Sequence, residues 1–297
     1  MRLGGALVLG AVALSMAGCA GHRSRPVHAS SPSAAASGRG ADRDDLQRSQ
    51  ADRYRQRNDS VPDRPPDIDS LVEPTPRVEP RSLYGNRSPY TVNGQTYTVL
   101  PTARGYDERG IASYYGNKFH GYKTSSLEPY DMYAFSAAST TLPLPSYARV
   151  TNLENGKSVI VRVNDRGPFH PNRIIDLSYA AAVKIGIWPK GTGLVEVRGI
   201  DPSQGSAELP PPPAVSASTA VGIYLQVGAF ADVANARRVA ARLQQAKLAS
   251  VQVTAVEVDG RHVQRVRVGP LRDAAEADAV SAQIVAMGLP RPRVAVD

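Results

Sequence analysis

The chain has 297 residues, enough for one or two domains of the usual size of about 100–200 residues each. Its formal net charge is +8, but Lys and Arg are spread along the chain and form no like-charge block. This distribution excludes the basic patch typical of nucleic-acid-binding proteins. The sequence contains neither a paired His/Cys cluster nor a glycine-rich phosphate loop, so we expect no metal and no other cofactor.

Residues 1–18 have the features of a secretion signal. Arg2 precedes an apolar run from Leu3 to Met16, which is shorter than the roughly 20 residues that a membrane-spanning helix needs. Cys19 follows directly and is the only cysteine, so the chain cannot form an internal disulfide. An unpaired thiol would be reactive in an oxidising compartment unless a modification consumes it. The alternative is an ordinary signal peptide followed by an incidental cysteine.

Two segments are expected to be disordered linkers. Residues 19–88 are rich in Arg, Asp, Ser, Ala and Pro and show neither helical nor strand periodicity. As a random coil, such a tether of about 70 residues would reach on the order of 40–50 Å. Residues 201–220 include four consecutive prolines, Pro210 to Pro213, which favour a stiff polyproline segment. Two folded modules therefore remain, at 89–200 and 221–297.

The central module, 89–200, consists of short apolar runs separated by turn residues, a pattern typical of a compact β-rich domain. Asn155-Gly156 lies between two such runs and predicts a two-stranded hairpin. A helix is expected over 178–185, with Asp176 or Ser178 as its cap and Gly186 as its stop. The polar residues 164–169 before it predict a functional loop. The expected strands are 90–100 around Asn93-Gly94, 148–152, 159–163 and 194–200.

The C-terminal module, 221–297, contains an internal repeat. A shift of 41 residues aligns Val227-Gly228 with Val268-Gly269 and Asp232 with Asp273. Each copy reads as a strand, a helix capped by the aspartate, and a second strand. Asp259-Gly260 supplies a turn between the copies. The pattern predicts a four-stranded antiparallel sheet with both helices on one face and the other face open to a ligand.

Both modules carry motifs that resemble the RlpA (rare lipoprotein A) family. The C-terminal module is similar to SPOR domains through the segments 224–230 and 265–271. The corresponding segments of the central module are 110–116, 119–121, 128–132, 141–143, 149–153, 164–169 and 173–178. The resemblance implies a mostly β double-psi β-barrel and a small α+β, ferredoxin-like SPOR domain, joined by disordered linkers.

The resemblance also implies a reaction. Lytic transglycosylases of this family cleave the MurNAc–GlcNAc bond of peptidoglycan strands stripped of stem peptides, at the division septum. An acid protonates the glycosidic oxygen, and the C6 hydroxyl of the same sugar closes a 1,6-anhydro ring. One carboxyl group with a raised pKa can serve as acid and then as base, because no water has to be placed on the far face of the sugar.

Position by position, the family's carboxyl groups correspond to Glu128, Asp131 and Asp165. For Asp165 the alternative is a loop-capping carboxylate, for Glu128 a solvated turn residue, and for Asp131 a residue that orients its loop. The family's histidine is replaced by Ser139, which cannot titrate near neutral pH. His120 and His170 lie in motif-rich loops, but we expect surface histidines there. The residues expected to contact sugar are Tyr115, Arg166, Gln226, Arg265 and Arg267.

The segment from Leu14 to Cys19 resembles a lipobox, which implies lipid attachment at Cys19 and anchoring to the periplasmic face of the outer membrane. The expected partners are thus glycan strands and the outer membrane, without nucleic acid, and the sequence identifies no division protein. The alternative function is a catalytically weak or inactive peptidoglycan-binding lipoprotein that links the outer membrane to the septal wall. Ser139 is the feature that favours this alternative.

Overall fold

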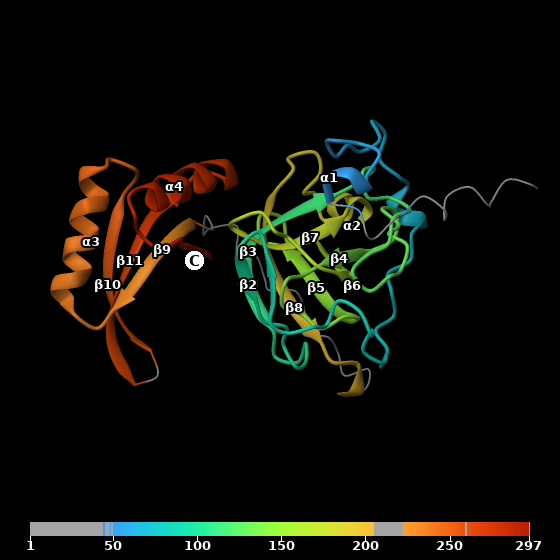
Figure 1. Cartoon of the computed structure of the whole chain (residues 1–297), viewed down its shortest axis with the longest axis horizontal. Helices are drawn as coiled ribbons and strands as arrows, with labels where there is room; N and C mark the ends of the chain where they lie inside the picture. Colours follow the sequence, from blue (N-terminus) through green and yellow to red (C-terminus); the bar gives the residue numbers. More distant parts are fainter. Residues whose placement is uncertain (1–43, 45–47, 49, 205–221, 259, 297) are drawn as a thin grey trace, which may run out of the picture. The chain divides into compact units, whose positions relative to one another are not determined.

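Six strands in the central part of the chain close into a β-barrel (Figure 1). The computed structural model describes residues 44, 48, 50–204, 222–258 and 260–296, so the predicted lipid site at Cys19 and the four prolines lie outside the described residues. The barrel strands are β3 (Asp107–Tyr115), β4 (Ser136–Ala138), β5 (Ser146–Asn152), β6 (Ser158–Asp165), β7 (Arg173–Ser178) and β8 (Gly193–Ile200).

The order of strands around the barrel is β3-β7-β4-β6-β5-β8. The pairs β3–β7 and β4–β6 are parallel, whereas all other neighbours are antiparallel. Strand β4 lies between β6 and β7, and its Ala138 pairs with a residue of each, so these two strands present side chains at the same end of the barrel. The predicted β-barrel is therefore confirmed, although β3, β4 and β7 were not among the expected strands.

The hairpin predicted around Asn155-Gly156 is confirmed by β5 and β6. The two strands are antiparallel, with Val150 opposite Val159, and Gly156 has the positive φ of +73° that its tight turn requires. Their buried valines belong to the main core. A second expected turn, Asn93-Gly94, joins β1 (Tyr90–Val92) and β2 (Gln95–Tyr97), which form a separate two-stranded sheet.

Helix α2 (Tyr179–Lys184) covers one side of the barrel core. The hydroxyl of Ser178 accepts a hydrogen bond from Ala181 N at 3.3 Å, so Ser178 is the N-cap and Asp176 is not. The helix body is buried, including the fully enclosed Tyr179. Gly186, with a φ of +75°, lies just beyond the end of the helix.

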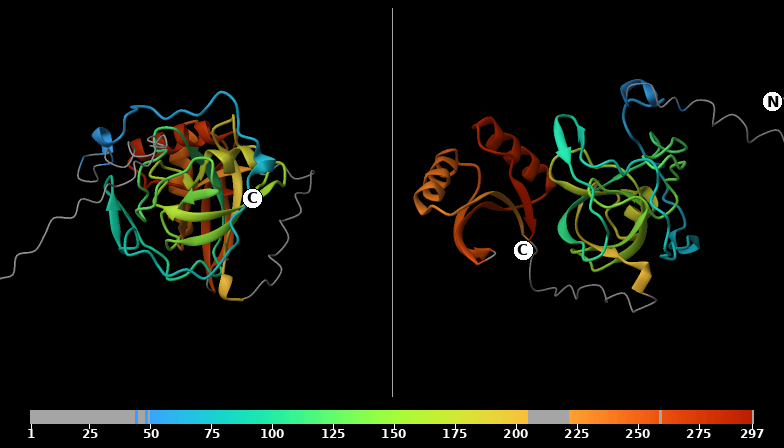
Figure 2. Two further views of the ribbon diagram at one scale, coloured as in Figure 1. Left: turned by 90° about the vertical axis from the view of Figure 1, so that its right-hand side faces the viewer. Right: turned by 60° about the horizontal axis from the view of Figure 1, so that its bottom comes forward.

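Residues 50–88 lie along the outside of the barrel, which differs from the expected disordered tether over this range (Figure 2). This arm contains α1 (Gln50–Arg53) and a 3-10 turn, η2 (Ile68–Ser70), and is otherwise extended. Leu71 packs against the barrel core, and Glu79 accepts hydrogen bonds from Arg162 at 2.9 and 3.0 Å. The arm is held on the barrel by few apolar contacts and by many hydrogen bonds from polar side chains. Its amino-acid composition is therefore similar to that of a disordered segment.

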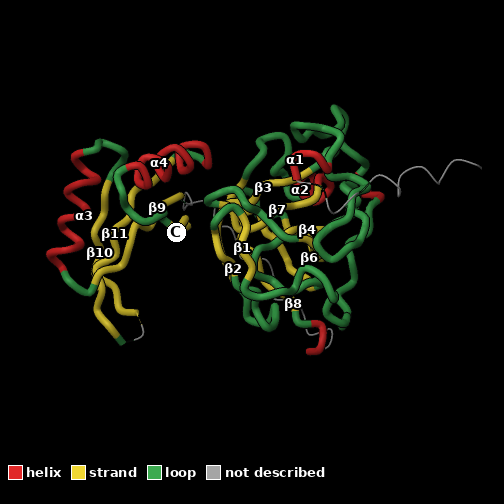
Figure 3. Tube along the Cα trace, viewed as in Figure 1, coloured by secondary structure: helices red, strands yellow, loops and turns green. Residues whose placement is uncertain are grey.

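The C-terminal part forms a four-stranded antiparallel sheet with two helices, as the repeat predicts (Figure 3). Asp232 and Asp273 cap the helices, through hydrogen bonds from Ala234 N at 2.7 Å and Glu276 N at 2.8 Å. Both helices pack their apolar faces on the buried side of β9 and β11. The elements are β9 (Ile223–Phe230), α3 (Val233–Gln245), β10 (Val251–Val258), β11 (Arg261–Leu271), α4 (Ala274–Ala286) and β12 (Arg293–Val296), in the strand order β10-β11-β9-β12.

No helix in the described ranges combines the length and the apolar character needed to cross a membrane.

Candidate active-site cleft

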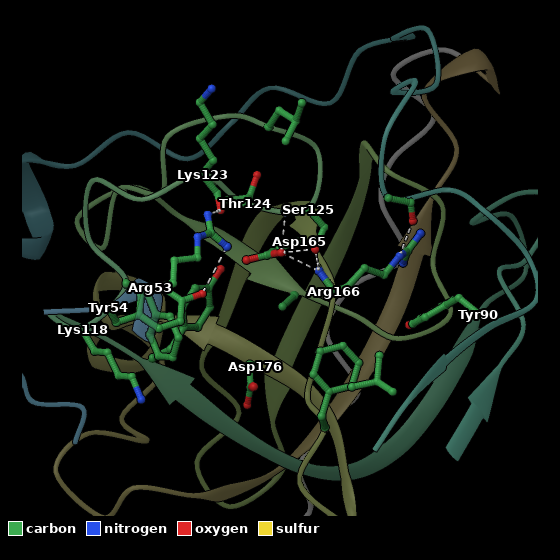
Figure 4. A pocket seen from close by; sticks show the side chains of 18 of the residues that line it. Arg53, Tyr54, Tyr90, Lys118, Lys123, Thr124, Ser125, Asp165, Arg166 and Asp176 are labelled. Carbon is green, nitrogen blue, oxygen red and sulfur yellow. Dashed lines mark hydrogen bonds between the residues drawn. The ribbon is translucent and has the colours of Figure 1, made fainter. Parts of the chain in front are cut away.

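A cleft of about 810 Å³ opens beside the ends of β6 and β7 (Figure 4). Its walls come from the barrel, from the loop before β4 and from the arm. The lining includes three groups of side chains: two carboxylates, five Lys or Arg residues, and several aromatic rings. They are Asp165 and Asp176; Arg53, Arg87, Lys118, Lys123 and Arg166; and Tyr54, Tyr90, Tyr115, Phe119 and Phe169.

The barrel topology brings Asp165 and Asp176 to the cleft together. Asp165 ends β6, Asp176 lies within β7, and Ala138 of the intervening β4 pairs with both of them. Because neighbouring strands lie about 4.8 Å apart, the two main-chain positions are roughly 10 Å apart. Gly167 has a φ of +146°, and a Cβ there would lie 3.6 Å from both Asp176 Oδ2 and Ala138 Cβ. The floor between the carboxylates is thus lined by the smallest side chains.

Asp165 is the predicted catalytic residue that the structure places in the cleft. Its Oδ1 accepts hydrogen bonds from Ser125 N at 2.7 Å, Ser125 Oγ at 2.6 Å and Arg166 N at 2.7 Å. Burial raises the pKa of Asp165, while these hydrogen bonds act in the opposite direction. The result is a fixed carboxyl group whose orientation is set by two neighbouring loops.

Asp176 is a second cleft carboxyl group, although the sequence indicates it only as a possible helix cap. Burial raises the pKa of Asp176 to about 6, and the main opposing effect is a hydrogen bond that Ser113 Oγ donates to Oδ1. A carboxyl group with this pKa can hold a proton in mildly acidic and near-neutral solution. The sequence does carry a signal, because Asp176 interrupts the apolar run 174–177.

Glu128 is not among the residues that line the cleft. Its carboxylate accepts hydrogen bonds from Arg162 Nη1 at 2.5 Å, Arg162 Nη2 at 2.9 Å and Asn164 Nδ2 at 2.9 Å. Partial burial raises the pKa of Glu128, but these hydrogen bonds outweigh it, so that the pKa is lowered overall. Arg162 also binds Glu79 of the arm. This cluster suits an ionised, structural carboxylate better than a general acid.

Asp131 and Ser139 also lie outside the cleft lining. The Asp131 side chain is 57% exposed, and its Oδ1 accepts a hydrogen bond from Tyr133 N at 2.9 Å, as in a residue that orients its own loop. The buried Ser139 hydroxyl accepts hydrogen bonds from Thr141 N at 3.2 Å and Leu142 N at 3.1 Å. Among the described residues that line the cleft there is no histidine, so no imidazole stands in for the one that Ser139 replaces.

Tyr115 and Arg166, both expected to contact sugar, do line the cleft. The Tyr115 ring stacks on Tyr130 with the ring centroids 4.1 Å apart, which fixes it in the wall. Arg166 donates hydrogen bonds to the carbonyl groups of Gly85 at 2.6 Å, Ser139 at 2.8 Å and Leu142 at 2.6 Å. Burial lowers the pKa of Arg166 to about 10, which leaves it charged at neutral pH. Arg166 therefore ties loops together at the cleft wall.

The remaining expected sugar contacts share one face of the C-terminal sheet. Gln226 alternates along β9 with the buried Leu225 and Val227, so it lies on the face opposite the helices. Arg267 is directly opposite Gln226 in the sheet, and its guanidinium carbon lies 5.9 Å from the ring centroid of Tyr224. Arg265 follows the same alternation along β11. The structure adds Arg293, which pairs with Gln226 from β12.

Within the described residues, no group of three or more His, Cys, Asp or Glu side chains is arranged to hold a metal ion. The chemistry that the cleft offers is that of two half-buried carboxyl groups surrounded by cationic and aromatic side chains. Such a site can donate and accept a proton and can stabilise a positive charge that develops on a bound molecule.

Two family descriptions match the chain: "Lytic transglycolase" over residues 107–198 and "SPOR domain" over residues 219–291. The first covers the six barrel strands except for the last two residues of β8, and it includes both cleft carboxylates. A solved structure, the SPOR domain of RlpA from Pseudomonas aeruginosa, is 34% identical and covers 25% of this chain and 97% of that one, with a TM-score of 0.24.

Curated relatives match across both domains. The endolytic peptidoglycan transglycosylase RlpA of Pseudomonas aeruginosa (strain UCBPP-PA14) is 39% identical over 277 residues, covering 76% of this chain and 81% of that protein. The protein of the same name from Vibrio cholerae is 40% identical, covering 74% of this chain and 81% of its own length. The RlpA of Neisseria meningitidis serogroup A is 55% identical over 130 residues. With this identity over most of its length, the chain belongs to the RlpA family.

Proposed function

We propose that the chain is a peptidoglycan lytic transglycosylase that cleaves the MurNAc–GlcNAc bond of peptide-stripped glycan strands and leaves a 1,6-anhydro end. The observation that carries the proposal is the pair of half-buried carboxyl groups, Asp165 and Asp176, on the floor of one cleft. The names of the curated relatives support the reaction class. Both carboxylates lie inside the matched lytic transglycolase region.

Asp176 accepts one hydrogen bond and Asp165 accepts three, which favours Asp176 as the acid. With its pKa raised to about 6, the Asp176 carboxyl group donates its proton to the glycosidic oxygen, and the C1–O bond breaks. The positive charge that develops at C1 is stabilised by Asp165, whose three hydrogen bonds favour its ionised form. The C6 hydroxyl then attacks C1 and gives its proton to Asp176, so the acid is restored without a water molecule.

With Asp176 as the acid, the three carboxyl groups predicted to be catalytic take different roles. Asp165 keeps a place in the reaction, as the carboxylate that faces the developing charge. Glu128 and Asp131 receive structural roles, because neither lines the cleft and Glu128 is held ionised by Arg162. No step is assigned to Ser139, because its hydroxyl accepts two main-chain hydrogen bonds.

The second part of the proposal concerns the location of the protein in the cell. We propose that the SPOR module binds bare glycan at the septum through Gln226, Arg265 and Arg267, and that lipid on Cys19 holds the protein on the periplasmic face of the outer membrane. The support is the cluster of these three side chains on one sheet face and the lipobox-like sequence. Tethering of the barrel to the same strand raises the local substrate concentration.

The test uses sacculi treated with an amidase that removes stem peptides. After incubation with the wild-type protein, mass spectrometry should find glycan fragments that end in 1,6-anhydro-MurNAc. The Asp176→Asn variant should release none above background, and Asp165→Asn should release far less than the wild type. Full activity of Asp176→Asn would reject the acid assignment.

A second candidate function is a peptidoglycan-binding lipoprotein with little or no catalysis, which links the outer membrane to the septal wall. The observation that favours it is Ser139, together with the lack of a histidine among the described residues of the cleft wall. The same experiment separates the two functions. Wild-type protein that co-sediments with stripped sacculi but yields no anhydro ends would establish the binding function instead.

A further inference from the structure

The arm that precedes the barrel is fitted into one end of the cleft by specific contacts. The carboxylate of Asp59 accepts hydrogen bonds from Gly116 N at 2.7 Å and Lys118 N at 3.0 Å, and Asn117 N donates to Ser60 O at 2.8 Å. A Cβ on Gly116 would lie 2.4 Å from Ser60 O, closer than van der Waals contact allows. Glycine at this position thus makes room for the arm.

This docking makes arm residues part of the cleft wall. The Tyr54 ring meets Phe119 and Tyr122 edge-on, with centroid distances of 4.9 and 5.1 Å. In Figure 4, Tyr54 and Lys118 lie together on one side of the cleft, across from Tyr90. Lys118 Nζ is 5.6 Å from the Tyr54 ring centroid and donates a hydrogen bond to Arg57 O at 3.0 Å. Aromatic faces and one carbonyl group therefore hold this ammonium group in place.

Lys118 is a fixed cation with unused donors. An ammonium group has three N–H donors, and the single hydrogen bond to Arg57 O leaves two for a ligand. No carboxylate partner of Lys118 is found in the part of the chain that the structure describes. The nearby Arg53 differs, because Asp44 binds it in an ion pair at 2.6 Å. Five cationic residues and only two carboxylates line the cleft, which favours an anionic ligand.

We propose that Lys118 and Tyr54 form a subsite for the lactyl carboxylate of a MurNAc residue next to the cleavage site. The inference rests on the proposed function, and it explains how the cleft would recognise stripped glycan. In intact peptidoglycan the lactyl carboxyl group is bound in an amide to the stem peptide, so it carries no charge. Removal of the peptide exposes a carboxylate that Lys118 binds, while the apolar face of the sugar packs on Tyr54.

The experiment compares two forms of soluble stripped glycan, one with free lactyl carboxylates and one in which carbodiimide and methylamine have converted them to neutral amides. The full-length wild-type protein should show a KM about 10-fold lower for the acid form and a similar kcat for both, because one charge-assisted contact is lost in the amide. Lys118→Gln should have the same high KM for both forms. Gly116→Ala, which displaces the arm and with it Tyr54 while Lys118 is kept, should behave similarly.

Lys157→Gln is the matched control, because it removes an exposed lysine outside the cleft lining. It should keep the wild-type preference. A readout that needs no turnover is the acylation of lysine side chains, mapped by mass spectrometry. The acid glycan should protect Lys118 from acylation, and the amidated glycan should not.

These readouts separate the two proposals. If the wild type cleaves neither glycan, the proposed function fails, and protection of Lys118 by the acid form alone would still support the subsite. If Lys118→Gln keeps the wild-type preference for the acid form, or if the acid glycan leaves the acylation of Lys118 unchanged, the subsite is overturned.

Discussion

Two groups of carboxyl groups, one lining the cleft and one around Arg162, have pKa values that shift in opposite directions. Asp165 and Asp176 line the cleft without an ion-pair partner in the described structure, and burial raises the pKa of both. Glu128 and Glu79 share Arg162, and the pKa of each is lowered. All four side chains carry a carboxyl group, so the difference comes from the stronger desolvation of the cleft pair and from Arg162, which donates hydrogen bonds only to Glu79 and Glu128. Acid chemistry therefore belongs to the unpaired group and structural support to the paired group.

The largest effect is expected when the cleft acid is removed, which tests whether the two groups of carboxyl groups have different roles. Asp176→Asn keeps the shape of the side chain but cannot donate a carboxyl proton, so kcat should fall by about 10²–10⁴-fold. Glycan binding should stay within a few-fold of the wild-type value. The rate of anhydro-end formation on stripped glycan measures the first effect, and co-sedimentation with sacculi measures the second. A loss of binding equal to the loss of rate would point to misfolding of the cleft.

The paired group should show the reverse pattern. Glu128→Gln should keep kcat within about 5-fold of the wild-type value, because Glu128 lies outside the cleft. Arg162→Ala should lower the free energy of unfolding by about 2 kcal/mol, since it leaves Glu79 and Glu128 without their shared cation in a partly exposed setting. Urea denaturation measures the stability. A loss of kcat in Glu128→Gln as large as that in Asp176→Asn would contradict the division.

The pH dependence of stability sharpens the comparison further. The pKa of Asp176 rises from its ordinary value of 3.8 to about 6 on folding, so ionisation costs more in the folded state. This penalty is absent below pH 3.8 and is complete above pH 6. Asp176→Asn should therefore be about 3 kcal/mol more stable than the wild type at pH 8 and similar to it near pH 3.8.

For Glu79 the sign is opposite. Its pKa is lowered to about 2, chiefly by the hydrogen bonds from Arg162, so its stabilising effect is present above pH 4.5 and is lost as the pH falls toward 2. Arg162→Ala should flatten this acid limb of the stability curve. Thermal unfolding followed between pH 2 and 8 tests both signs in one series of measurements, and an unchanged acid limb in Arg162→Ala would contradict the account.

The smallest expected effect concerns the C-terminal sheet. Gln226→Ala should weaken binding of the full-length protein to stripped sacculi by about 3–10-fold, because one amide lies among Arg267, Arg293 and Tyr224 on the exposed face. The kcat on short soluble glycan should not change. Val227→Thr is a poor substitute for this test, since Val227 belongs to the buried face.

The sequence predicts those parts of the fold that depend on short-range signals. The hairpin at Asn155-Gly156 and the repeated strand-helix-strand units are visible because turn chemistry and periodicity act within a few residues. The cleft depends instead on the strand order β7-β4-β6, which places Asp176 and Asp165 on either side of Ala138. No spacing in the sequence reveals that arrangement, so the sequence does not predict Asp176 as a cleft residue.

The sequence does not predict the docked arm, for a related reason. Its residues are polar, so composition alone predicts disorder, whereas Asp59, Glu79 and Asn86 each satisfy main-chain or arginine donors of the barrel. Whether such a polar residue holds the arm on the barrel depends on a hydrogen-bond partner far along the chain. Gly116 shows the same dependence, since the need for glycine there is apparent only once Ser60 lies against it.

The most direct test of the central claim is a titration of Asp176 in the folded protein by carbon-13 NMR of its side-chain carboxyl group, with Asp176→Asn to assign the signal. The account predicts a transition near pH 6. A transition below pH 4 would show that Asp176 is ionised throughout the working range. In that case it could not act as the acid, and the contrast between the cleft carboxylates and the arginine-paired carboxylates would be wrong.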